Sequence, residues 1–177
     1  MKVILYIAVS ADGFIADKNG SVSWLEKYGD GTGTEDCGYK KFYESIDALV
    51  FGKNTYEQVL TFGPWPYPGK KSYIFADKQT HAANNDIEIV VDTDIPTFLD
   101  RMKKLGIKRL WLMGGAQLVQ SFEDCNAIDE YILTILPEKL QEGIALPTQI
   151  FHATNLKLLD TITYPDLGIV QKYYEKN

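Results

Sequence analysis

The fold follows from one stretch, Arg109-Leu-Trp-Leu-Met-Gly-Gly-Ala-Gln-Leu118. Its first half is an apolar run typical of a buried parallel strand, and its second half opens an amphipathic pattern that continues to Cys125. Gly114 and Gly115 join the two halves. Because glycine has no Cβ atom, backbone N–H groups can approach an anion closely there, and the next helix directs its partially positive amino end to the same place. The stretch predicts a cradle for a nucleotide phosphate, with an ordinary strand-to-helix turn as the alternative.

A second turn of the same type follows the apolar run Asp47-Ala-Leu-Val-Phe51. Gly52 ends the strand pattern, Lys53 supplies a mobile cation, and a helical pattern extends from Tyr56 to Leu60. Thr55 either caps this helix or donates its hydroxyl hydrogen to a phosphate oxygen. Two such turns in one small chain predict a ligand with several phosphates, such as a dinucleotide.

Better-known motifs do not fit the chain. A P-loop requires a glycine five residues before its Gly-Lys pair, and Asp47 stands at that position. The stretch Gly31-Thr-Gly-Thr-Glu-Asp36 approaches the dinucleotide fingerprint but lacks its third glycine and a preceding strand, so we expect a mobile loop. The only histidines, His81 and His152, are far apart, and no H-E-x-x-H or G-x-S-x-G occurs. We therefore expect neither a metal site nor a hydrolase.

Composition limits the remaining classes. The 177 residues, 45% of them hydrophobic, predict a single domain over residues 1–177. A net charge of −6 without a basic stripe argues against a nucleic-acid partner. The apolar run Val3 to Val9 is too short for a membrane span or a signal core, so we expect a cytoplasmic protein with Cys37 and Cys125 as thiols.

Hydrophobic periodicity predicts an α/β class with a mostly parallel sheet flanked by helices. Expected strands are Lys2–Val9, Asp47–Phe51, Lys71–Phe75, Ile87–Val91, Arg109–Leu112 and Ile128–Ile135. Expected helices are Glu35–Ile46, Tyr56–Leu60, Ile95–Leu105 and Ala116–Asp124. Leu156–Thr163 and Ile169–Tyr174 predict an antiparallel hairpin at the carboxyl end. In such sheets the ligand lies beyond the carboxyl ends of the strands, where both glycine turns fall.

A long loop follows the first strand, from Ser10 through Asp12-Gly13 to Trp24. Long loops at a ligand-binding edge are commonly lids, although a surface turn with Trp24 buried beneath it fits the sequence equally well.

Asp36 lies at the edge of the apolar stripe formed by Tyr39, Phe42, Tyr43 and Ile46. A carboxylic acid in an apolar cleft retains its proton more readily and can give it to a substrate. The alternative is structural: Thr32-Gly-Thr-Glu35 would form a capping box, and Asp36 would only complement the helix dipole.

Five motifs occur in an order shared by one protein family. They are Ser10-x-Asp12-Gly13-Phe-Ile, Gly52-Lys53-x-Thr55-Tyr-Glu57, Pro68-Gly69-Lys70-Lys71, Gly114-Gly115-Ala116-x-Leu118 and Asp129-Glu130-x-x-Leu-Thr134. Together they resemble the dihydrofolate reductase-like superfamily, and within it the stand-alone bacterial proteins related to the reductase domain of the bifunctional riboflavin-biosynthesis deaminase/reductase. The likeness runs from Met1 to about Pro147, and it implies the three-layer α/β fold of that superfamily.

The resemblance also implies NADPH binding and assigns residues to it. Asp36 precedes Gly52 by the sixteen residues that separate the catalytic acid from the matching glycine in dihydrofolate reductases. The nicotinamide would lie against Ala8 and Ile15, and the phosphates against Gly52, Lys53, Asn54, Thr55, Gly114, Gly115, Ala116, Gln117 and Leu118. The substrate would meet Asp12, Trp24, Tyr39 and Thr134, of which Trp24 and Thr134 match an active-site tryptophan and a threonine that supports the substrate and the acid.

Departures from the family pattern narrow the function. Lys40 stands where folate enzymes carry phenylalanine, and Met113 replaces an acidic residue that riboflavin-type reductases use for the ribosyl group. Ala76-Asp77 replaces hydroxyl residues that help to bind the 2′-phosphate, which leaves Lys53 and Lys78 to select NADPH over NADH.

The sequence therefore favours an NADPH-dependent reductase that transfers hydride to a C=N or C=O bond of a pyrimidine- or pterin-like small molecule. One alternative is the riboflavin-pathway reduction of 5-amino-6-(5-phosphoribosylamino)uracil, and another is a nucleotide-binding module without catalysis. Apolar strand edges and the family resemblance predict a homodimer.

Overall fold

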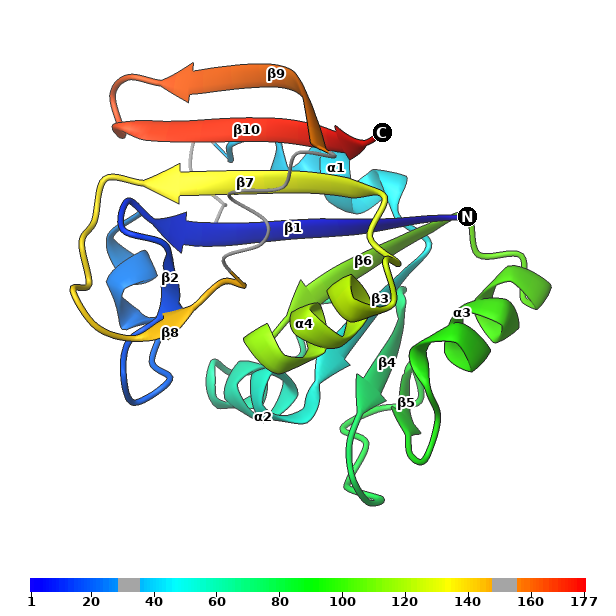
Figure 1. The fold of residues 1–177 in the computed structure, drawn as a ribbon. Coiled ribbons are helices and arrows are strands. Elements are labelled where there is room, and N and C mark those ends of the chain that lie inside the picture. Colours follow the sequence, from blue (N-terminus) through cyan, green and yellow to red (C-terminus); the bar gives the residue numbers. More distant parts are fainter. Residues whose placement is uncertain (29–35, 148–155) are drawn as a thin grey trace. The chain divides into compact units, whose positions relative to one another are not determined.

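A computed structural model describes residues 1–28, 36–147 and 156–177 (Figure 1). The expected loop at residues 31–35, the proposed capping-box residues Thr32 and Glu35, and His152 lie outside the described residues. The chain forms two compact units that share strand β1 (Lys2–Ser10). Unit 1 comprises Met1–Leu5 and Ile46–Ile128, and unit 2 comprises Tyr6–Ser45 and Asp129–Asn177. We describe each unit by itself, and the predicted single domain stays a prediction.

Unit 1 is built on parallel strands. Its hydrogen-bonded order is β5-β4-β3-β6-β1, and every pairing in it is parallel. The elements after the start of β1 are β3 (Ala48–Gly52), α2 (Lys53–Thr61), β4 (Lys71–Phe75), β5 (Ile87–Val90), α3 (Ile95–Lys104), β6 (Arg109–Gly114) and α4 (Ala116–Asp124). Leu49, Val50 and Phe51 are completely buried, as are Leu110 and Leu112. These strands are apolar without alternation because both of their faces are covered.

Unit 2 is largely antiparallel. From β1 the strand order continues to β7 (Glu130–Leu136), β10 (Ile169–Lys176) and β9 (Leu156–Tyr164), and the last two pairings are antiparallel. The other elements are β2 (Phe14–Ala16), the 3₁₀ helix η1 (Ser23–Tyr28), α1 (Tyr39–Ser45) and β8 (Ile144–Ala145), and β2 pairs with β8. The predicted α/β fold, with a mostly parallel sheet and an antiparallel hairpin at the carboxyl end, is confirmed.

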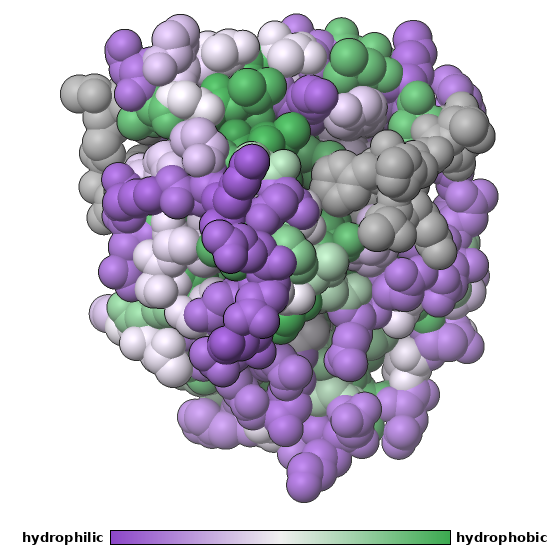
Figure 2. Space-filling view, turned by 60° about the vertical axis from the view of Figure 1, so that its left-hand side comes forward, coloured by the Kyte–Doolittle hydropathy of each residue, from purple (hydrophilic) through white to green (hydrophobic). Residues whose placement is uncertain are grey.

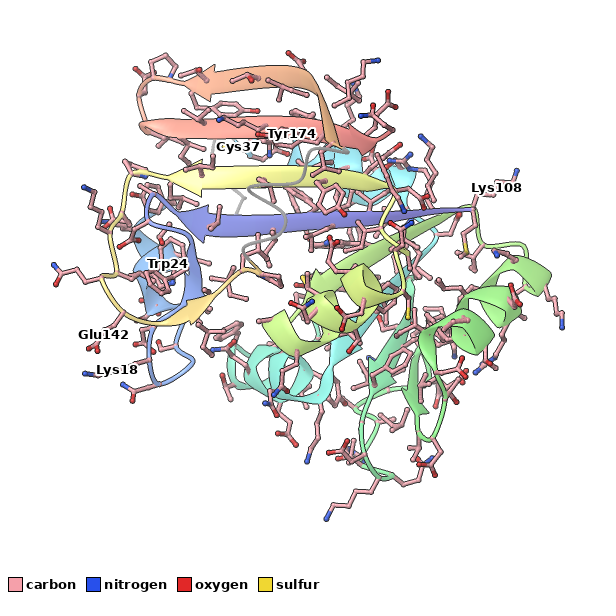
Figure 3. All side chains as sticks on the ribbon, in the orientation of Figure 1. Lys18, Trp24, Cys37, Lys108, Glu142 and Tyr174 are labelled. Atoms are coloured by element: carbon pink, nitrogen blue, oxygen red, sulfur yellow. The ribbon has the colours of Figure 1, made fainter. Side chains whose placement is uncertain are left out.

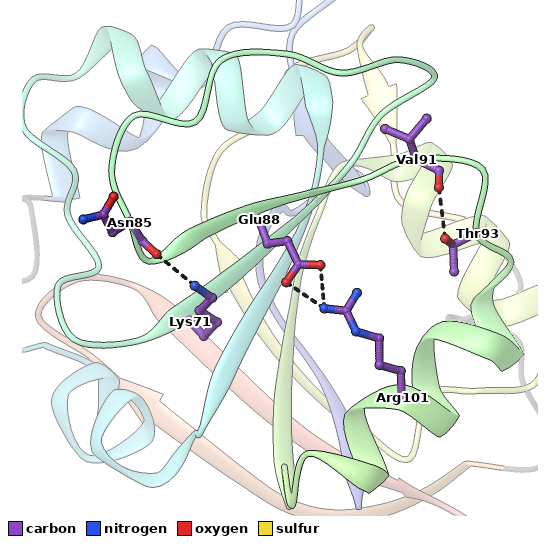
Figure 4. A network of polar contacts seen from close by, with 6 residues as sticks. All are labelled: Lys71, Asn85, Glu88, Val91, Thr93 and Arg101. Atoms are coloured by element: carbon purple, nitrogen blue, oxygen red, sulfur yellow. Dashed lines mark hydrogen bonds and ion pairs between the residues drawn. The ribbon is translucent and has the colours of Figure 1, made fainter.

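Helix α3 shows how local chemistry sets the bounds of an element. The Asp94 carboxylate accepts a hydrogen bond from the Thr97 N–H at 2.7 Å, Pro96 lies in the first turn, and Gly106 follows the helix with a φ of +79°. Arg101 in the last turn contacts Glu88 of β5, with Nη2 2.6 Å from Oε2 (Figure 4). The predicted helix Ile95–Leu105 is therefore confirmed to within one residue.

Two helix predictions are wrong at their amino ends. The helix expected over Glu35–Ile46 begins at Tyr39, because Cys37 and Gly38 have φ values of +50° and +76° that no α-helix accepts. The helix expected from Tyr56 begins at Lys53, directly after Gly52. The sequence pattern missed this first turn because Lys53, Asn54 and Thr55 carry no apolar periodicity.

The surface is mixed. Hydrophilic residues cover most of the face shown in Figure 2, while Leu158 and Leu159 of β9 are each 51% exposed. No helix in the described ranges has both the length and the apolar character needed to cross a membrane.

Asp47 joins two segments of unit 1. Its Oδ2 accepts hydrogen bonds from the N–H groups of Lys108 and Arg109, at 2.7 and 2.9 Å, where β6 begins. Partial burial opposes ionisation, but these backbone bonds and the charges of Lys70 and Lys108 together lower the pKa of Asp47 below its usual 3.8.

We expect Asp47→Ala to lower the free energy of unfolding by about 1 kcal/mol at pH 7, since a charged but largely exposed acceptor is lost. Because the folded-state pKa is lowered, this contribution exists above the ordinary pKa and is lost as the pH falls through the folded value. Denaturant unfolding at pH 7 and at pH 3 measures it, and Asp47→Asn, which keeps one acceptor oxygen, should lose less. Equal losses at both pH values would contradict this account.

Candidate functional site

The first glycine turn ends a fully buried strand. Phe51 is completely buried, Gly52 is the N-cap of α2, and no side chain caps that helix. The first N–H groups of α2 are thus left without the usual side-chain acceptor. Lys53 lies in the first turn, with its Nζ 3.6 Å from Glu57 Oε1 at a solvent-exposed position. Asn54 is exposed and Thr55 is half-buried beside them.

The second turn repeats this arrangement at the end of β6. Gly114 is buried with a φ of +119°, a backbone conformation that favours glycine, and its peptide bond to Gly115 is cis. Gly115 is the N-cap of α4, again without a side-chain cap. Ala116 and Gln117 open that helix, and Leu118 packs into the core with 8% of its surface exposed.

The two turns meet inside unit 1. Phe51 of β3 pairs with Gly114 of β6, so both strands end together. A Cβ atom added to Gly52 would lie 3.5 Å from the Gly115 nitrogen, and one added to Gly115 would lie 3.0 Å from Thr55 Oγ1. The structure therefore brings Gly52 and Thr55 from the first turn together with Gly114 and Gly115 from the second.

This arrangement fits an anionic group. Two helix starts without side-chain caps present N–H dipoles at their amino ends, the Thr55 hydroxyl of the first lies close to Gly115 of the second, and the Lys53 ammonium belongs to the first turn of α2. Backbone donors and a cation are the groups that hold phosphates in proteins. The residues present thus suit the diphosphate of a pyridine nucleotide, and side chains at the two glycines would fill the space.

Asp36 lies in unit 2 at the start of α1. Its Oδ1 accepts a hydrogen bond from the Gly38 N–H and its Oδ2 one from the Lys40 N–H, both at 2.9 Å. The carboxylate therefore stabilises the first turn of the helix, which agrees with the alternative that gave Asp36 a structural role at the helix start. Its role as a proton donor stays a prediction.

Thr134 and Tyr39 also belong to unit 2. Thr134 Oγ1 accepts a hydrogen bond at 2.9 Å from Nε2 of Gln171, which is completely buried. Tyr39 lies with its ring centroid 6.5 Å from that of Tyr6, and burial raises the pKa of Tyr39 to about 12. Sequence reasoning missed Gln171 and Tyr6, although a glutamine at an inward position of the strand Ile169–Tyr174 was a visible signal.

Two carboxylates connect the loop after β1 to residues 138–141: Asp12 of the loop itself, and Glu138 of the distant segment. Asp12 accepts hydrogen bonds from Ser10 Oγ at 2.6 Å and from the N–H groups of Leu140 and Gln141 at 3.2 and 2.8 Å. Glu138 accepts a bond from the Tyr28 hydroxyl at 2.7 Å and pairs with Lys27. Asp12 thus holds the loop to a distant segment, and its predicted contact with substrate stays a prediction.

Trp24 lies in η1 of this loop, and Figure 3 labels it together with the ion-paired Lys18 and Glu142, whose Nζ and Oε1 are 2.7 Å apart. The Trp24 indole Nε1 is buried and has no hydrogen-bond partner in the described part of the chain. A buried donor of this kind is available to a ligand acceptor. Ala8 on β1 and Ile15 on β2, the predicted nicotinamide contacts, are half-buried in unit 2.

Comparison with known proteins identifies relatives for this arrangement. Residues 69–166 match the family described as the RibD C-terminal domain. The chain is 37% identical over 161 residues to the uncharacterized protein YwjB of Bacillus subtilis (strain 168), covering 90% of each chain. It is 31% identical over 188 residues to the uncharacterized protein YyaP of the same organism, covering 99% of this chain and 95% of that protein.

Solved structures share the fold. A Shewanella sp. PV-4 protein, provisionally named as a riboflavin biosynthesis protein, is 26% identical with a TM-score of 0.85 and covers 100% of this chain and 99% of its own. The Thermotoga maritima diaminohydroxyphosphoribosylaminopyrimidine deaminase/5-amino-6-(5-phosphoribosylamino)uracil reductase is 14% identical, with a TM-score of 0.74 over 99% of this chain and 56% of that chain. A pyrimidine reductase-like protein of Corynebacterium diphtheriae is 16% identical, with a TM-score of 0.72 over 99% of this chain and 92% of its own. The last two likenesses support the predicted dihydrofolate reductase-like fold.

We expect Gly115→Ala to lower the free energy of unfolding by about 1–3 kcal/mol, because the new methyl group would meet Thr55 Oγ1 at 3.0 Å. The φ of −78° at Gly115 suits alanine, so the cost is steric and not conformational. The double variant Gly115→Ala/Thr55→Ala should recover most of the loss in denaturant unfolding. Strict additivity of the two single changes would show that the two turns do not touch.

Proposed function

The chain belongs to the RibD C-terminal domain family, a family of reductase domains, and from this we propose that it is an NADPH-dependent reductase acting on a pyrimidine- or pterin-like small molecule. The supporting observation is the contact between the Gly52 and Gly114–Gly115 turns, each at the start of a helix that no side chain caps. Donors converging from two helix starts suit the paired phosphates of a dinucleotide better than a single anion.

When bound, the cofactor would supply a hydride to a C=N or C=O bond of the substrate. We propose that the residues of the chain bind the cofactor and orient it toward the substrate. Backbone N–H groups at residues 53–55 and 115–118 and the Thr55 hydroxyl would hold the phosphates, while Lys53 balances their charge. A proton must join the heteroatom of the reduced bond, and we propose that Asp36 gives it directly or through water.

Two alternative functions can be distinguished from this one by a single set of binding and activity measurements. Reduction of the ribosyl group in 5-amino-6-(5-phosphoribosylamino)uracil is the riboflavin-pathway reaction, and Met113 lacks the charge that riboflavin-type reductases place before the Gly-Gly turn. A nucleotide-binding module would bind NADPH without turnover. Titration with NADPH, followed by nicotinamide oxidation with pterins, flavin precursors and small carbonyl compounds, separates these functions. Absence of NADPH binding would overturn the proposal. The homodimer and the cytoplasmic location stay predictions.

We expect Lys53→Ala to weaken NADPH binding about tenfold, since one charge-assisted contact to a phosphate is lost. Glu57→Gln should leave NADPH affinity unchanged or improve it, because the variant removes the carboxylate that pairs with the Lys53 ammonium. Lys103→Ala, which removes a lysine of α3 that is paired with Asp100, is the matched control. Fluorescence titration measures all three, and equal affinities in Lys53→Ala and Lys103→Ala would exclude Lys53 from the site.

We expect Asp36→Ser to reduce kcat about 10²- to 10⁴-fold while leaving NADPH affinity unchanged. Serine can keep one of the two bonds to the start of the helix and removes the acid, so the melting temperature should fall only slightly. Retained turnover in Asp36→Ser would assign Asp36 to helix capping alone.

A further inference from the structure

The segment after β4, residues 76–83, lies beside the start of α2. The last residue of β4 is paired with Gly52, the residue that precedes α2. At the other end of the segment, the Tyr56 hydroxyl of α2 donates a hydrogen bond to the His81 carbonyl at 3.0 Å and accepts one from the Ala83 N–H at 2.9 Å. The segment is therefore held at both of its ends next to the first turns of α2.

Two aspartates stand just beyond the ends of neighbouring strands in this region. Strands β4 and β5 are parallel, and the last pair between them joins Phe75 with Val90. Asp77 and Asp92 each follow this pair by two residues, and Figure 4 shows the end of β5 at Val91. Because parallel strands end at the same edge of a sheet, both carboxylates belong to the edge at which the Gly52 turn also lies.

The charged side chains at this edge are available to a ligand. Asp77, Lys78 and Asp92 are exposed, and within the described ranges none of them makes a hydrogen bond or an ion pair. Lys53 in the first turn of α2 is already paired with Glu57, with Nζ 3.6 Å from Oε1. Among these five residues the carboxylates outnumber the ammonium groups, so the edge does not favour an additional anion by charge alone.

The order of the strands decides which half of a dinucleotide would reach this edge. The proposed diphosphate site lies at the ends of β3 and β6, with β4 on the far side of β3 and β1 on the far side of β6. A dinucleotide that lies across the strand ends places one nucleoside on each side of its phosphates. The predicted nicotinamide contact Ala8 belongs to β1, so the adenosine half would extend past β4 toward Asp77.

NADPH and NADH differ at this adenosine half alone. NADPH carries a phosphate on the 2′-oxygen of the ribose, with a charge of about −1.5 to −2 at pH 7, and NADH carries a hydroxyl there. The Lys78 ammonium would attract that phosphate, whereas the carboxylates of Asp77 and Asp92 would repel it. Contacts between exposed charges are individually weak, and here they have opposite signs. The ribose hydroxyl of NADH can instead donate a hydrogen bond to a carboxylate.

We propose that Asp77 and Asp92 cancel the attraction of Lys78 for a 2′-phosphate, so that the site binds NADH and NADPH with similar affinity. Asp77 is the main specificity-determining residue, because it belongs to the segment beside α2, and Asp92 adds its charge from the neighbouring strand. The inference rests on the proposed reductase function and extends its cofactor from NADPH to both nucleotides.

The test is a fluorescence titration of the full chain with NADPH and with NADH at one ionic strength. In the wild type the two dissociation constants should agree within about fivefold. Asp77→Asn should raise NADPH affinity about fivefold, and Asp77→Asn/Asp92→Asn about tenfold, because repulsion of the phosphate is removed. NADH affinity should stay unchanged, since asparagine retains an acceptor oxygen for the ribose hydroxyl. Lys78→Ala should weaken the binding of NADPH but not of NADH.

Asp86→Asn is the matched control. Asp86 is also exposed, but it precedes β5 and therefore lies at the opposite end of that strand from Asp92. The same change of charge there should leave both affinities unaltered. Asparagine tolerates the φ of +51° at Asp92, so Asp92→Asn should fold like the wild type. Adenosine 2′,5′-bisphosphate and AMP, titrated by NMR, repeat the comparison with the adenosine half alone and should respond to the same variants.

The inference is overturned if either nucleotide binds the wild type more than about fivefold more tightly than the other. It is also overturned if Asp77→Asn leaves NADPH affinity unchanged, or if it changes both affinities alike, which would assign Asp77 to structural support. In each of these cases the nucleotides still bind and the reductase function stands. A wild type that binds neither NADPH nor NADH overturns the reductase function itself.

Discussion

The structure depends on the close approach of the two turns that end strands β3 and β6. Strands β3 and β6 end side by side, and their turns are so near that a methyl group on Gly115 would press on the Thr55 hydroxyl. Both helices that leave these turns start without a side-chain cap. Fully buried strands bring the turns together, and the missing Cβ atoms keep the first N–H groups of each helix open to a ligand. Strand packing and the proposed anion site are therefore consequences of the same two positions.

The sequence predicted an element of the fold where the residues of that element carried a local pattern, and it failed where they did not. The strands Asp47–Phe51 and Arg109–Leu112 were predictable because continuous apolar runs mark strands covered on both faces. The start of α1 was not, since the left-handed backbone at Cys37 is a non-glycine exception that propensities do not anticipate. The short strands β2 and β8 carry too few residues for a periodic signal.

The candidate site was predictable to a similar degree. Gly52 and Gly114–Gly115 were predictable because each follows an apolar run that indicates a strand. The family resemblance assigned site roles to Asp36 and Thr134. The hydrogen bonds of Gln171 with Tyr6 and Thr134 could not be anticipated, because they join residues 165 and 37 positions apart and depend on which strands are neighbours. The capping bonds of Asp36 are local, and the first-turn alternative had already described that role in outline. The two parts of the chain thus supply different chemistries: converging backbone dipoles with a lysine in unit 1, and neutral hydroxyl and amide groups in unit 2.

The hydrogen bonds of Asp12 also determine when the amino-terminal loop can reach its final structure during synthesis of the chain. The Asp12 carboxylate is held by N–H groups of Leu140 and Gln141, which lie 128 and 129 residues further along. A ribosome adds about 5–20 residues each second, so the acceptor emerges on the order of ten seconds before its donors. During that interval the amino-terminal loop has no fastening from this carboxylate, and the segment acquires its final form only when most of the polypeptide has been made.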